Sequence, residues 1–482
     1  MAETRGDFTA PKLGIGMIFA TALRPFLERR PGALDLLEIE PQTLWLADDA
    51  LAGPFYEFTP GIELFAALAG HKLVHSVGMP LGGTRAPDPA QCALIRATAE
   101  RLASPWVSEH LSVGGTPHRA SGFFLPPLQT DEGVATAARN IRAFAAAVGR
   151  PVAVETGVAY LARKPFEMPD GDYVAQVAGE AGCGILLDLH NLYCNQRNGR
   201  IRIDDFLARI PLDRVWEVHL AGGAERDGFW LDSHSGPMPD DLAALAREVL
   251  ASLPNLGALN FEIYDTFLER TDQAVLDSIV DGLRDLWDRA GRSVSDARPR
   301  DLAPSASVSA PNPDLWEAAL TEAVWKDLPG AHPYAEDDAP VRLYARLARS
   351  FRGSMLTRVL PRALRYLMLR DGMGIEATLS EYYAAVSPRL YSPLEAAAFR
   401  DWLLGRDADP LLRGLIDYDA ALLRIIREGK PQVVTFPGNP APVFEALAER
   451  RLPDLPPPPE WEIEILPDGF TIADFSGAAG LT

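Results

Sequence analysis

The sequence predicts an α/β protein, a TIM (β/α)8 barrel followed by a mostly helical α+β domain. Two observations predict the barrel: short apolar runs alternate with Ala- and Leu-rich segments of helical length, and eight such runs occur before residue 262. Strand–helix alternation favours parallel strands with right-handed crossovers, and eight units close into a barrel. The expected strands are Leu13–Ile18, Asp35–Ile39, Lys72–Val77, Pro105–Ser108, Pro151–Val154, Gly184–Leu187, Val215–Leu220 and Ala258–Phe261.

The segments between these runs have the signals of helices. Pro89–Ala103 begins with Asp88 as a cap and proline at the first helical position, which is a good start signal. A doubly wound open sheet is the alternative fold, but no GxGxxG or P-loop follows any of the runs, and the barrel is favoured. Further helices are expected at Thr136–Val148, Gly171–Ala181, Asp204–Ile210, Pro239–Ser252 and Thr271–Gly291.

A change of composition after the last barrel helix divides the chain. Residues 293–313 are rich in Ser, Pro and Ala without periodicity, which is typical of a linker. We therefore expect a catalytic barrel domain over 1–292 and a second, mainly helical domain over 314–482. Its helices are expected at Asp314–Trp325, Pro340–Ser350, Ser354–Met368, Ile375–Ser387, Pro393–Leu404 and Pro410–Glu428, and its strands at Gln432–Thr435, Trp461–Leu466 and Phe470–Ile472.

The second domain has one histidine and no clustered ligand-type residues. An exposed strand near its end suggests a binding module that accepts a peptide by strand addition. A purely structural cap on the barrel is the alternative.

Composition restricts the class of protein. The net charge of −20 argues against nucleic-acid binding, because an acidic surface repels a phosphate backbone. No apolar stretch is long enough to span a membrane, and the N-terminus lacks the basic and apolar regions of a signal peptide. The three cysteines form neither a disulfide framework nor a CxxC pattern. We expect a cytoplasmic protein with no membrane partner.

Histidine and carboxylate residues follow nearly every predicted strand. Seven of the eight histidines lie before residue 240. Side chains at the carboxyl ends of barrel strands meet at one mouth, and carboxylates crowded there repel one another unless cations lie among them. The pattern predicts a multinuclear metal site. The strand-end residues are Glu38, Glu40, His75, Glu109, His110, Glu155, Asp188, His190, Asn191, Glu217, His219, Glu262 and Asp265.

The stretch from Val215 to His234 carries the densest set of these residues. Its ligand-type side chains are His219, Asp232 and His234, and an Asp-x-His pair in an extended segment points both side chains to one face. Carboxylate with imidazole suits iron, manganese or zinc better than calcium or magnesium. The alternative is a surface Asp–His pair.

Several residues of reactive type are expected outside the site. Cys92 and Cys183 are expected in the core, and Cys194 is expected as an incidental loop cysteine. The remaining residues in this group are expected in turns, loops or solvated surface: His71, His118, Arg24 and Arg119.

Nine short motifs support a family resemblance that covers nearly the whole barrel. In chain order they are GIGM, LLEIEPQ, HSVGMPLG, WVSEHLS, AVET, GILLDLHNLYCN, VWEVHLAGG, LDSH and FEIYD. With these motifs the chain resembles the methanobactin-synthase-type (MbnB/TglH-like) family of multinuclear non-haem iron enzymes, which modify ribosomally made peptides. The architecture is also similar to sugar-isomerase and abasic-site-endonuclease barrels.

The resemblance implies two or three iron ions of mixed Fe(II)/Fe(III) valence, with O2 as co-substrate. It also implies catalytic residues that orient ligands or substrate, namely Glu109, His190 and Glu217. The implied metal ligands are His75, His110, Glu155, Asp188, Asn191, His219, Asp232, His234 and Glu262.

The resemblance further implies a partner that holds the leader of a precursor peptide. The region after the linker resembles such a partner (MbnC/TglI-like) fused in the same chain, mainly through Val359-Leu360-Pro361 and its flanking helices. Fusion raises the effective concentration of the two functions.

Five positions depart from the family pattern. Pro41-Gln42-Thr43 stands where Pro-Glu-Asn is common, and Thr156 replaces an Asn. His190 replaces a frequent Asn, and Gly223 stands where a further His is common. Because these positions flank the expected site, they bear on the number of metals and on the reaction.

The leading hypothesis is an iron- and O2-dependent oxidative enzyme that modifies a precursor peptide at cysteine. A thiolate is a soft ligand for iron, which makes cysteine the expected target. Two other classes remain: a divalent-metal hydrolase or isomerase, and a metal-dependent scaffold without catalysis. A phosphodiester substrate needs a basic rim, and a sugar isomerase needs a lysine near the metals; the strand ends offer neither.

Overall fold

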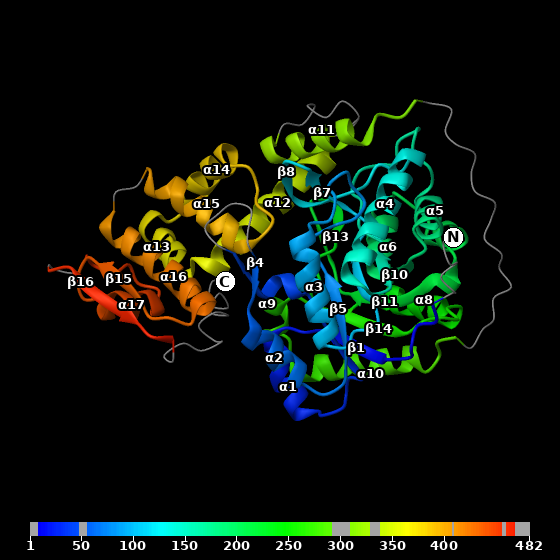
Figure 1. Cartoon of the computed structure of the whole chain (residues 1–482), viewed down its shortest axis with the longest axis horizontal. Helices are drawn as coiled ribbons and strands as arrows, with labels where there is room; N and C mark the ends of the chain where they lie inside the picture. Colours follow the sequence, from blue (N-terminus) through cyan, green and yellow to red (C-terminus); the bar gives the residue numbers. More distant parts are fainter. Residues whose placement is uncertain are drawn as a thin grey trace.

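The barrel predicted from the sequence is present in the computed structural model, which describes residues 8–47, 55–291, 309–327, 338–406, 409–455 and 459–467. Eight parallel strands form a closed barrel in the order β1-β14-β11-β10-β9-β6-β5-β2, and β2 pairs with β1 (Figure 1). All eight predicted strands are confirmed. Their bounds are β1 Gly14–Ile18, β2 Leu36–Ile39, β5 His71–Ser76, β6 Val107–His110, β9 Val152–Glu155, β10 Gly184–Asp188, β11 Val215–Ala221 and β14 Ala258–Glu262.

Helices surround the barrel, as the strand–helix alternation predicts. The Asp88 side chain accepts a hydrogen bond from the Gln91 N–H, which confirms the predicted cap of α3. α4 begins five residues before its predicted start because Thr130 caps it and two acidic residues fill its first turn. The α-helices are α1 Arg24–Arg29, α2 Thr59–Ala67, α3 Pro89–Arg101, α4 Asp131–Val148, α5 Asp170–Ala181, α6 Leu189–Arg197, α7 Ile203–Leu207, α8 Asp240–Ala251, α9 Asp265–Leu268 and α10 Gln273–Trp287.

Three two-stranded hairpins follow barrel strands at the carboxyl end and are absent from the sequence prediction. One of them had a clear signal, because Asp227-Gly228 is a typical hairpin turn and both residues have positive φ, 55° and 81°. The strands of the other two hairpins show no alternation of apolar and polar residues long enough to predict a strand from the sequence. The hairpins are β3 Trp45–Ala47 with β4 Phe55–Glu57, β7 Val113–Thr116 with β8 Arg119–Leu125, and β12 Ala224–Arg226 with β13 Phe229–Leu231.

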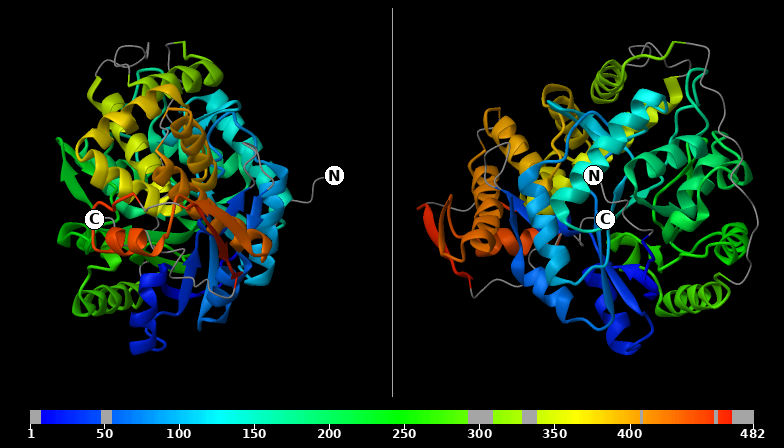
Figure 2. Two further views of the ribbon diagram at one scale, coloured as in Figure 1. Left: turned by 90° about the vertical axis from the view of Figure 1, so that its left-hand side faces the viewer. Right: turned by 45° about the vertical axis from the view of Figure 1, so that its right-hand side comes forward.

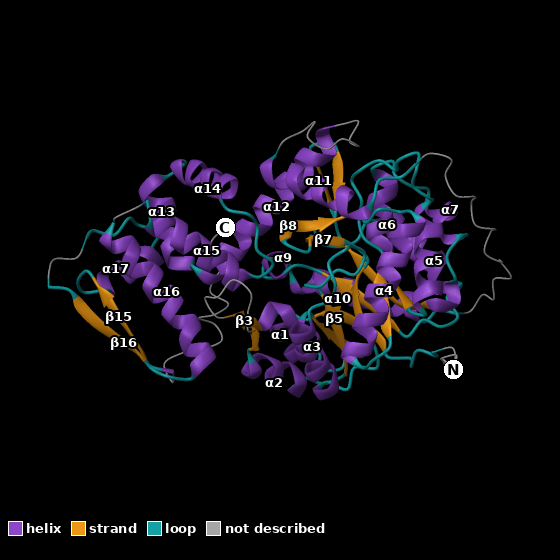
Figure 3. Ribbon diagram, turned by 45° about the horizontal axis from the view of Figure 1, so that its top comes forward, coloured by secondary structure: helices purple, strands orange, loops and turns teal. Residues whose placement is uncertain are grey.

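The second part of the chain is mainly helical and ends in a two-stranded antiparallel sheet, as predicted (Figure 3). One helix, α12, passes through Gly353 where two helices were predicted; the break falls at Leu360 because Pro361 starts a new helix. The elements are α11 Pro313–Lys326, α12 Asp338–Val359, α13 Pro361–Asp371, α14 Gly374–Ala385, α15 Ser392–Leu404, α16 Pro410–Glu428, β15 Gln432–Phe436, α17 Ala441–Ala448 and β16 Trp461–Ile465.

Two segments of the prediction lie wholly or largely outside the described residues. The expected strand Phe470–Ile472 is one, and most of the expected linker, 293–313, is the other. Among the helices that the structure describes, none has an apolar stretch that could cross a lipid bilayer.

The two parts of the chain pack against each other at the carboxyl end of the barrel. α11 and α12 cover the β7–β8 hairpin, and Trp316 and Tyr344 share an apolar cluster with Val113 and Leu125 (Figure 2). Arg119, expected to be solvated, instead pairs with Glu322 of α11 and lies 4.5 Å from the ring centre of Trp325. The helical part therefore borders the mouth of the barrel.

A buried carboxylate lies at this junction. Glu317 of α11 is 2% exposed, and its two oxygens accept the Thr84 N–H at 2.8 and 3.0 Å. Burial raises the pKa of Glu317 to about 7, which the hydrogen bonds from Thr84 only partly offset. The junction therefore contains a group that titrates near neutrality.

This group predicts how thermal stability changes with pH. The pKa of Glu317 in the folded protein exceeds its ordinary value. The contribution of Glu317 to the free energy of unfolding is therefore largest below the ordinary pKa and declines as the pH rises to about 7. Relative to Glu317→Gln, the wild-type melting temperature should fall by about 2–4 °C between pH 5 and pH 8. Calorimetry measures this difference. Glu322→Gln, on a more exposed site of α11, should keep the wild-type dependence; an equal change in both variants contradicts the prediction.

Candidate metal centre

Ligand-type side chains from six barrel strands meet at the carboxyl end of the barrel. The carboxyl ends of the parallel barrel strands bring these residues to one level at the mouth of the barrel. Asp188, the last residue of β10, also caps α6, since its Oδ1 accepts the Asn191 N–H at 2.7 Å. The contributing residues are His75 of β5, Glu109 and His110 of β6, Glu155 of β9, Asp188 of β10, Glu217 and His219 of β11, and Glu262 of β14.

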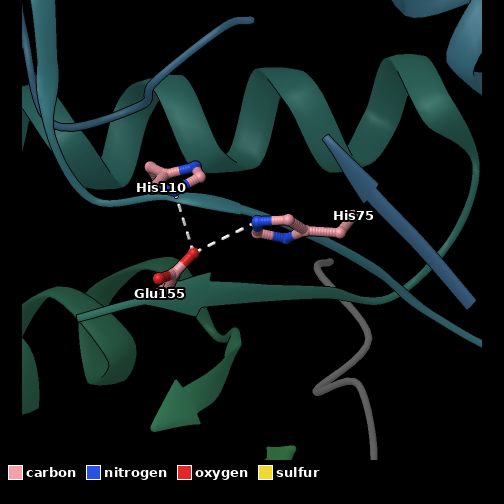
Figure 4. A group of neighbouring side chains, drawn as sticks. All are labelled: His75, His110 and Glu155. Carbon is pink, nitrogen blue, oxygen red and sulfur yellow. Dashed lines mark ion pairs between the residues drawn. The ribbon is translucent and has the colours of Figure 1, made fainter. Parts of the chain in front are cut away.

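One group consists of His75, His110 and Glu155 (Figure 4). Oε2 of Glu155 lies 3.2 Å from Nε2 of His75 and 3.1 Å from Nε2 of His110. The other ring nitrogen of His75 lies 2.9 Å from the Ser108 hydroxyl, which fixes the orientation of the ring. The Nε2 atoms and the carboxylate thus face one point.

A second group consists of His190, Asp232 and His234. Oδ1 of Asp232 lies 3.0 Å from Nδ1 of His190 and 2.9 Å from Nε2 of His234. His234 has a positive φ of 43°, which is unusual for a residue with a Cβ and is typical of functional positions. Its carbonyl accepts the Tyr264 N–H, and the two rings lie 4.8 Å apart.

His219 and Glu262 connect these groups at the centre of the cluster. Glu262 reaches His219 Nδ1 with one oxygen at 2.7 Å and His234 Nε2 with the other at 3.0 Å. Asp188 has a donor atom within 4.8 Å of those of Glu155 and His219, and likewise of those of His234 and Glu262. The donors therefore form one continuous cluster.

Burial and mutual repulsion control the charge of these groups. Burial raises the pKa of Asp188 well above its ordinary value, and the charges of Glu155 and Asp232 raise it further. Burial also opposes ionisation of Glu262, but His219 and His234 outweigh it and hold that pKa well below the ordinary value. The imidazoles of His219 and His234 thus keep Glu262 ionised, whereas the neighbouring carboxylates oppose ionisation of Asp188.

Seven buried ligand atoms of the cluster make no hydrogen bond of normal geometry among the described residues, although four of them lie within 3.2 Å of another ligand atom of the cluster. Such atoms are costly to bury unless a cation or water satisfies them. Imidazole with carboxylate suits iron, manganese or zinc, so the donor set fits the metal that the sequence predicts. The atoms are Glu38 Oε1, Glu155 Oε2, Asp188 Oδ2, Asn191 Oδ1, His219 Nδ1 and Nε2, and His234 Nε2.

The nine residues expected as ligands all lie in this cluster. Asn191 is the least direct member, because its Nδ2 donates to Glu155 Oε1 and to the Thr156 carbonyl, each at 3.1 Å. Only its Oδ1 remains to face a metal. The structure thus brings the expected set together.

The three residues expected to orient ligands or substrate divide into two kinds. Glu109 lies behind His110, since it accepts both the backbone N–H and the ring Nδ1 of that residue. Glu217 lies behind His219 and accepts hydrogen bonds from Trp106 and Asn260. His190 stands at ligand distance in the group with Asp232 and His234, and Glu217 also stands at ligand distance in a group with Glu38 and His219.

Two buried residues were missing from the sequence-based site. Glu38 was noted at the end of its strand but not chosen, and its Oε2 lies 3.0 Å from His219 Nε2. Asn260 donates to Glu38 and Glu217 at 2.9 and 2.7 Å. The signal for Asn260 was its position two residues before Glu262, which places both on one face of β14.

The residues expected outside the site are mostly where the sequence placed them. His71 and His118 are exposed, and Cys92 and Cys183 are buried. His71 begins β5 instead of lying in a turn, and Arg119 pairs with Glu322. Cys194 also differs from the prediction, because it lies in α6 rather than a loop and its buried Sγ is 3.8 Å from His190 Nε2. The helical spacing of four residues accounts for that contact.

The positions that depart from the family pattern have defined contacts. Gln42 donates to the Ser76 hydroxyl at 2.6 Å, and the Thr156 hydroxyl accepts the Asp188 N–H at 3.2 Å. A Cβ at Gly223 would lie 2.6 Å from His190 Nε2, so the imidazole of residue 190 fills the space of a side chain at 223. The histidine at 190 and the glycine at 223 are thus sterically linked.

The fold and cluster define a TIM-barrel protein with a metal-type site at its mouth. Residues 14–272, more than half of the chain, match the family model described as RiPP precursor modification enzyme MbnB/TglH/ChrH, and the chain belongs to this family. Relatives include the UPF0276 protein of Chromobacterium violaceum, 36% identical over 177 residues, which are 37% of this chain and 64% of that protein. That match spans less than two thirds of the relative. The UPF0276 protein of Anaeromyxobacter sp. is 28% identical over 46% of this chain and 79% of its own length.

Solved structures with a similar arrangement share little sequence with this chain. The IOLI protein with a bound zinc atom is 12% identical, with a TM-score of 0.39 over 57% of this chain and 99% of its own. An L-ribulose 3-epimerase is 16% identical, with a TM-score of 0.37 over 59% and 99%. Similarity at this level says nothing about the substrate of this chain.

The contact between Gly223 and His190 predicts a specific defect. Gly223→Ala should push the His190 ring away from Asp232, because its Cβ would meet Nε2 at 2.6 Å and the Leu231 carbonyl at 2.6 Å. Fe(II) affinity at that group should fall at least about tenfold, as for other perturbed ligand geometries. Elemental analysis after reconstitution measures the loss. Gly179→Ala, whose Cβ meets nothing within 4 Å, is the control; wild-type iron content in Gly223→Ala contradicts the prediction.

Proposed function

We propose that this protein is an iron-dependent, O2-using enzyme that modifies a ribosomally synthesised precursor peptide at cysteine. The observation that carries the proposal is the buried cluster of five imidazoles and several carboxylates, several of whose ligand atoms make no hydrogen bond of normal geometry among the described residues. Membership of the precursor-modification family supports a peptide as the substrate.

The cluster offers overlapping sets of donors for two or three ions. His75, His110 and Glu155 form one set. His190, Asp232 and His234 form another, and Asp188, His219 and Glu262 join the two. Bound iron would supply open positions for O2 and a substrate thiolate, together with the change of oxidation state that the reaction needs.

The residues around the donors keep them in fixed positions. Glu109 holds His110 through two contacts, and Glu217, itself held by Trp106 and Asn260, holds His219. Such outer contacts fix the tautomer and the orientation of a ligating imidazole. We therefore assign Glu109 and Glu217 to positioning the rings.

The mouth of the cluster has aromatic and acidic neighbours that suit a peptide substrate. Phe124 of β8 lies 4.4 Å from the His110 ring, and Tyr264, which is 52% exposed, lies over His234. Burial raises the pKa of the Glu40 carboxyl beside this cluster. The rings exclude water on two sides, and Glu40 is suited to hold a proton near the substrate.

We assign leader binding to the second part of the chain. β16 pairs with β15 on one side only among the described residues, and an edge strand can accept an extended peptide through its backbone. Exposed apolar side chains accompany this sheet, notably Val433 at 61%, Trp461 at 46% and Leu466 at 46%. Backbone pairing with apolar contacts is a typical mode of peptide capture.

The metal content is the first test of the proposed function. Anaerobically purified protein should contain two or three irons per chain by elemental analysis and Mössbauer spectroscopy. His219→Ala and Asp232→Ala should each lose most of this iron, because each removes a donor shared by two neighbours. O2 uptake should require a cysteine-containing precursor. Zinc or manganese alone, with no uptake of iron on reconstitution, contradicts the proposal and favours a hydrolase or isomerase.

Leader binding predicts an effect of one exposed tryptophan. Trp461→Ala should weaken binding of a cysteine-containing precursor peptide by about tenfold or more, because large aromatic residues dominate such interfaces. Titration calorimetry measures the affinity. Leu315→Ala changes a residue that is 64% exposed on α11 and should leave the affinity unchanged. Equal affinity of wild type and Trp461→Ala contradicts binding at this sheet.

A further inference from the structure

Two buried tyrosines of the second part of the chain contact the barrel near the metal-type cluster. Tyr391 precedes α15 and is 6% exposed, yet its ring packs within the barrel core against Trp45 and Phe55. Tyr344 of α12 is fully buried against Tyr160. Neither tyrosine belongs to the cluster, so their phenol groups need another explanation.

The phenol of Tyr391 holds the turn that follows β5. Its oxygen is within hydrogen-bond distance of the Gln91 side-chain oxygen and lies 3.3 Å from the Gly78 carbonyl. A Cβ at Gly78 would lie only 2.5 Å from the phenol oxygen, so the two groups are in close contact. Movement of Tyr391 would therefore move residues 76–79.

Both ends of this turn donate hydrogen bonds to Glu109, the residue that contacts the His110 ring. The Ser76 hydroxyl and the Met79 N–H lie 2.6 and 3.0 Å from Oε2 of Glu109. The other oxygen of Glu109 accepts the His110 N–H at 2.8 Å and lies 3.3 Å from its Nδ1. A continuous series of contacts thus leads from Tyr391 to a metal-type imidazole.

The phenol of Tyr344 begins a shorter series on the opposite side of the cluster. It accepts the Tyr160 N–H at 3.0 Å, and the Tyr160 hydroxyl accepts the Asp232 N–H at 3.3 Å. Asp232 is the carboxylate between His190 and His234. The two tyrosines therefore reach different groups of donors.

We propose that the region after residue 313 completes the metal centre itself: Tyr391 positions His110 through the 76–79 turn, and Tyr344 positions Asp232 through Tyr160. This role goes beyond capture of a leader and rests on the proposed metal site. It makes both tyrosines positioning residues, since neither touches the donors directly. The packing of the helical region on the barrel therefore affects the positions of His110 and Asp232. A substitution that loosens this packing should change metal binding.

Removal of the phenol oxygen alone tests this role, because phenylalanine keeps the ring and its packing. Tyr391→Phe leaves the buried Gln91 oxygen without its donor and releases the Gly78 carbonyl. Tyr344→Phe removes the acceptor of the Tyr160 N–H. Tyr366→Phe is the matched control, because Tyr366 donates to Asp409 and packs in the apolar cluster of the helical region.

Two measurements separate positioning from general stability. In the metal-free full-length protein, amide exchange followed by mass spectrometry should accelerate at 76–79 in Tyr391→Phe and at 160 and 232 in Tyr344→Phe, with neither change in Tyr366→Phe. With Co(II) alone as the probe, both variants should change the visible spectrum. They should also bind up to about tenfold more weakly, the scale seen for residues behind metal ligands.

Each other outcome has a definite meaning. Wild-type exchange and Co(II) spectra in folded Tyr391→Phe and Tyr344→Phe overturn the proposal, as do equal changes in Tyr366→Phe. If Tyr391→Phe does not fold, Gln91→Leu removes the same hydrogen bond from the barrel side and must give the same local exchange. If wild type binds neither iron nor cobalt, the proposed function fails, while exchange in the metal-free variants still decides whether the tyrosines position these segments.

Discussion

The burial of the Asp188 carboxylate among other carboxylates is the main electrostatic constraint on this structure. The carboxylate is fully buried, it lies among other carboxylates, and one of its oxygens has no hydrogen-bond partner among the described residues. Burial of charge without compensation is among the largest costs in a folded protein, so positive charge must lie beside it. Imidazoles at His219 and His234 supply part of that charge, and the orphaned donor atoms indicate where cations would supply the rest.

The side chains around the cluster hold its imidazoles and carboxylates in fixed positions. Three of the five imidazoles in the cluster have a further contact that fixes the ring: Ser108 for His75, Glu109 for His110, and Glu217 for His219. Asn260 in turn donates to two carboxylates that would otherwise repel each other. The barrel interior near the mouth is therefore a polar network, whereas its walls are packed by apolar side chains from the strands and surrounding helices.

The helical region extends this network rather than standing apart from it. α11 and α12 cover a hairpin at the mouth, and Tyr391 belongs to the same apolar cluster as the barrel strands. Its contacts lie 300 residues or more away along the chain, at Gln91 and Gly78. The family model covers the barrel, residues 14–272. In this chain a second, helical region also packs on the barrel, and its hydrogen bonds lead to residues that position the metal-type imidazoles.

Local periodicity determined much of this protein. Alternation of apolar runs and helical segments predicted the eight strands, and strand-end histidines and carboxylates predicted the cluster, because parallel strands in a barrel bring their carboxyl ends together. Spacing along the chain could not reveal that His190 takes the space beside Gly223, or that Glu38 and Asn260 join Glu217. These contacts join residues from different strands and loops, so side-chain packing in three dimensions decides them, as it decides the approach of Tyr391 and Tyr344 to the barrel mouth.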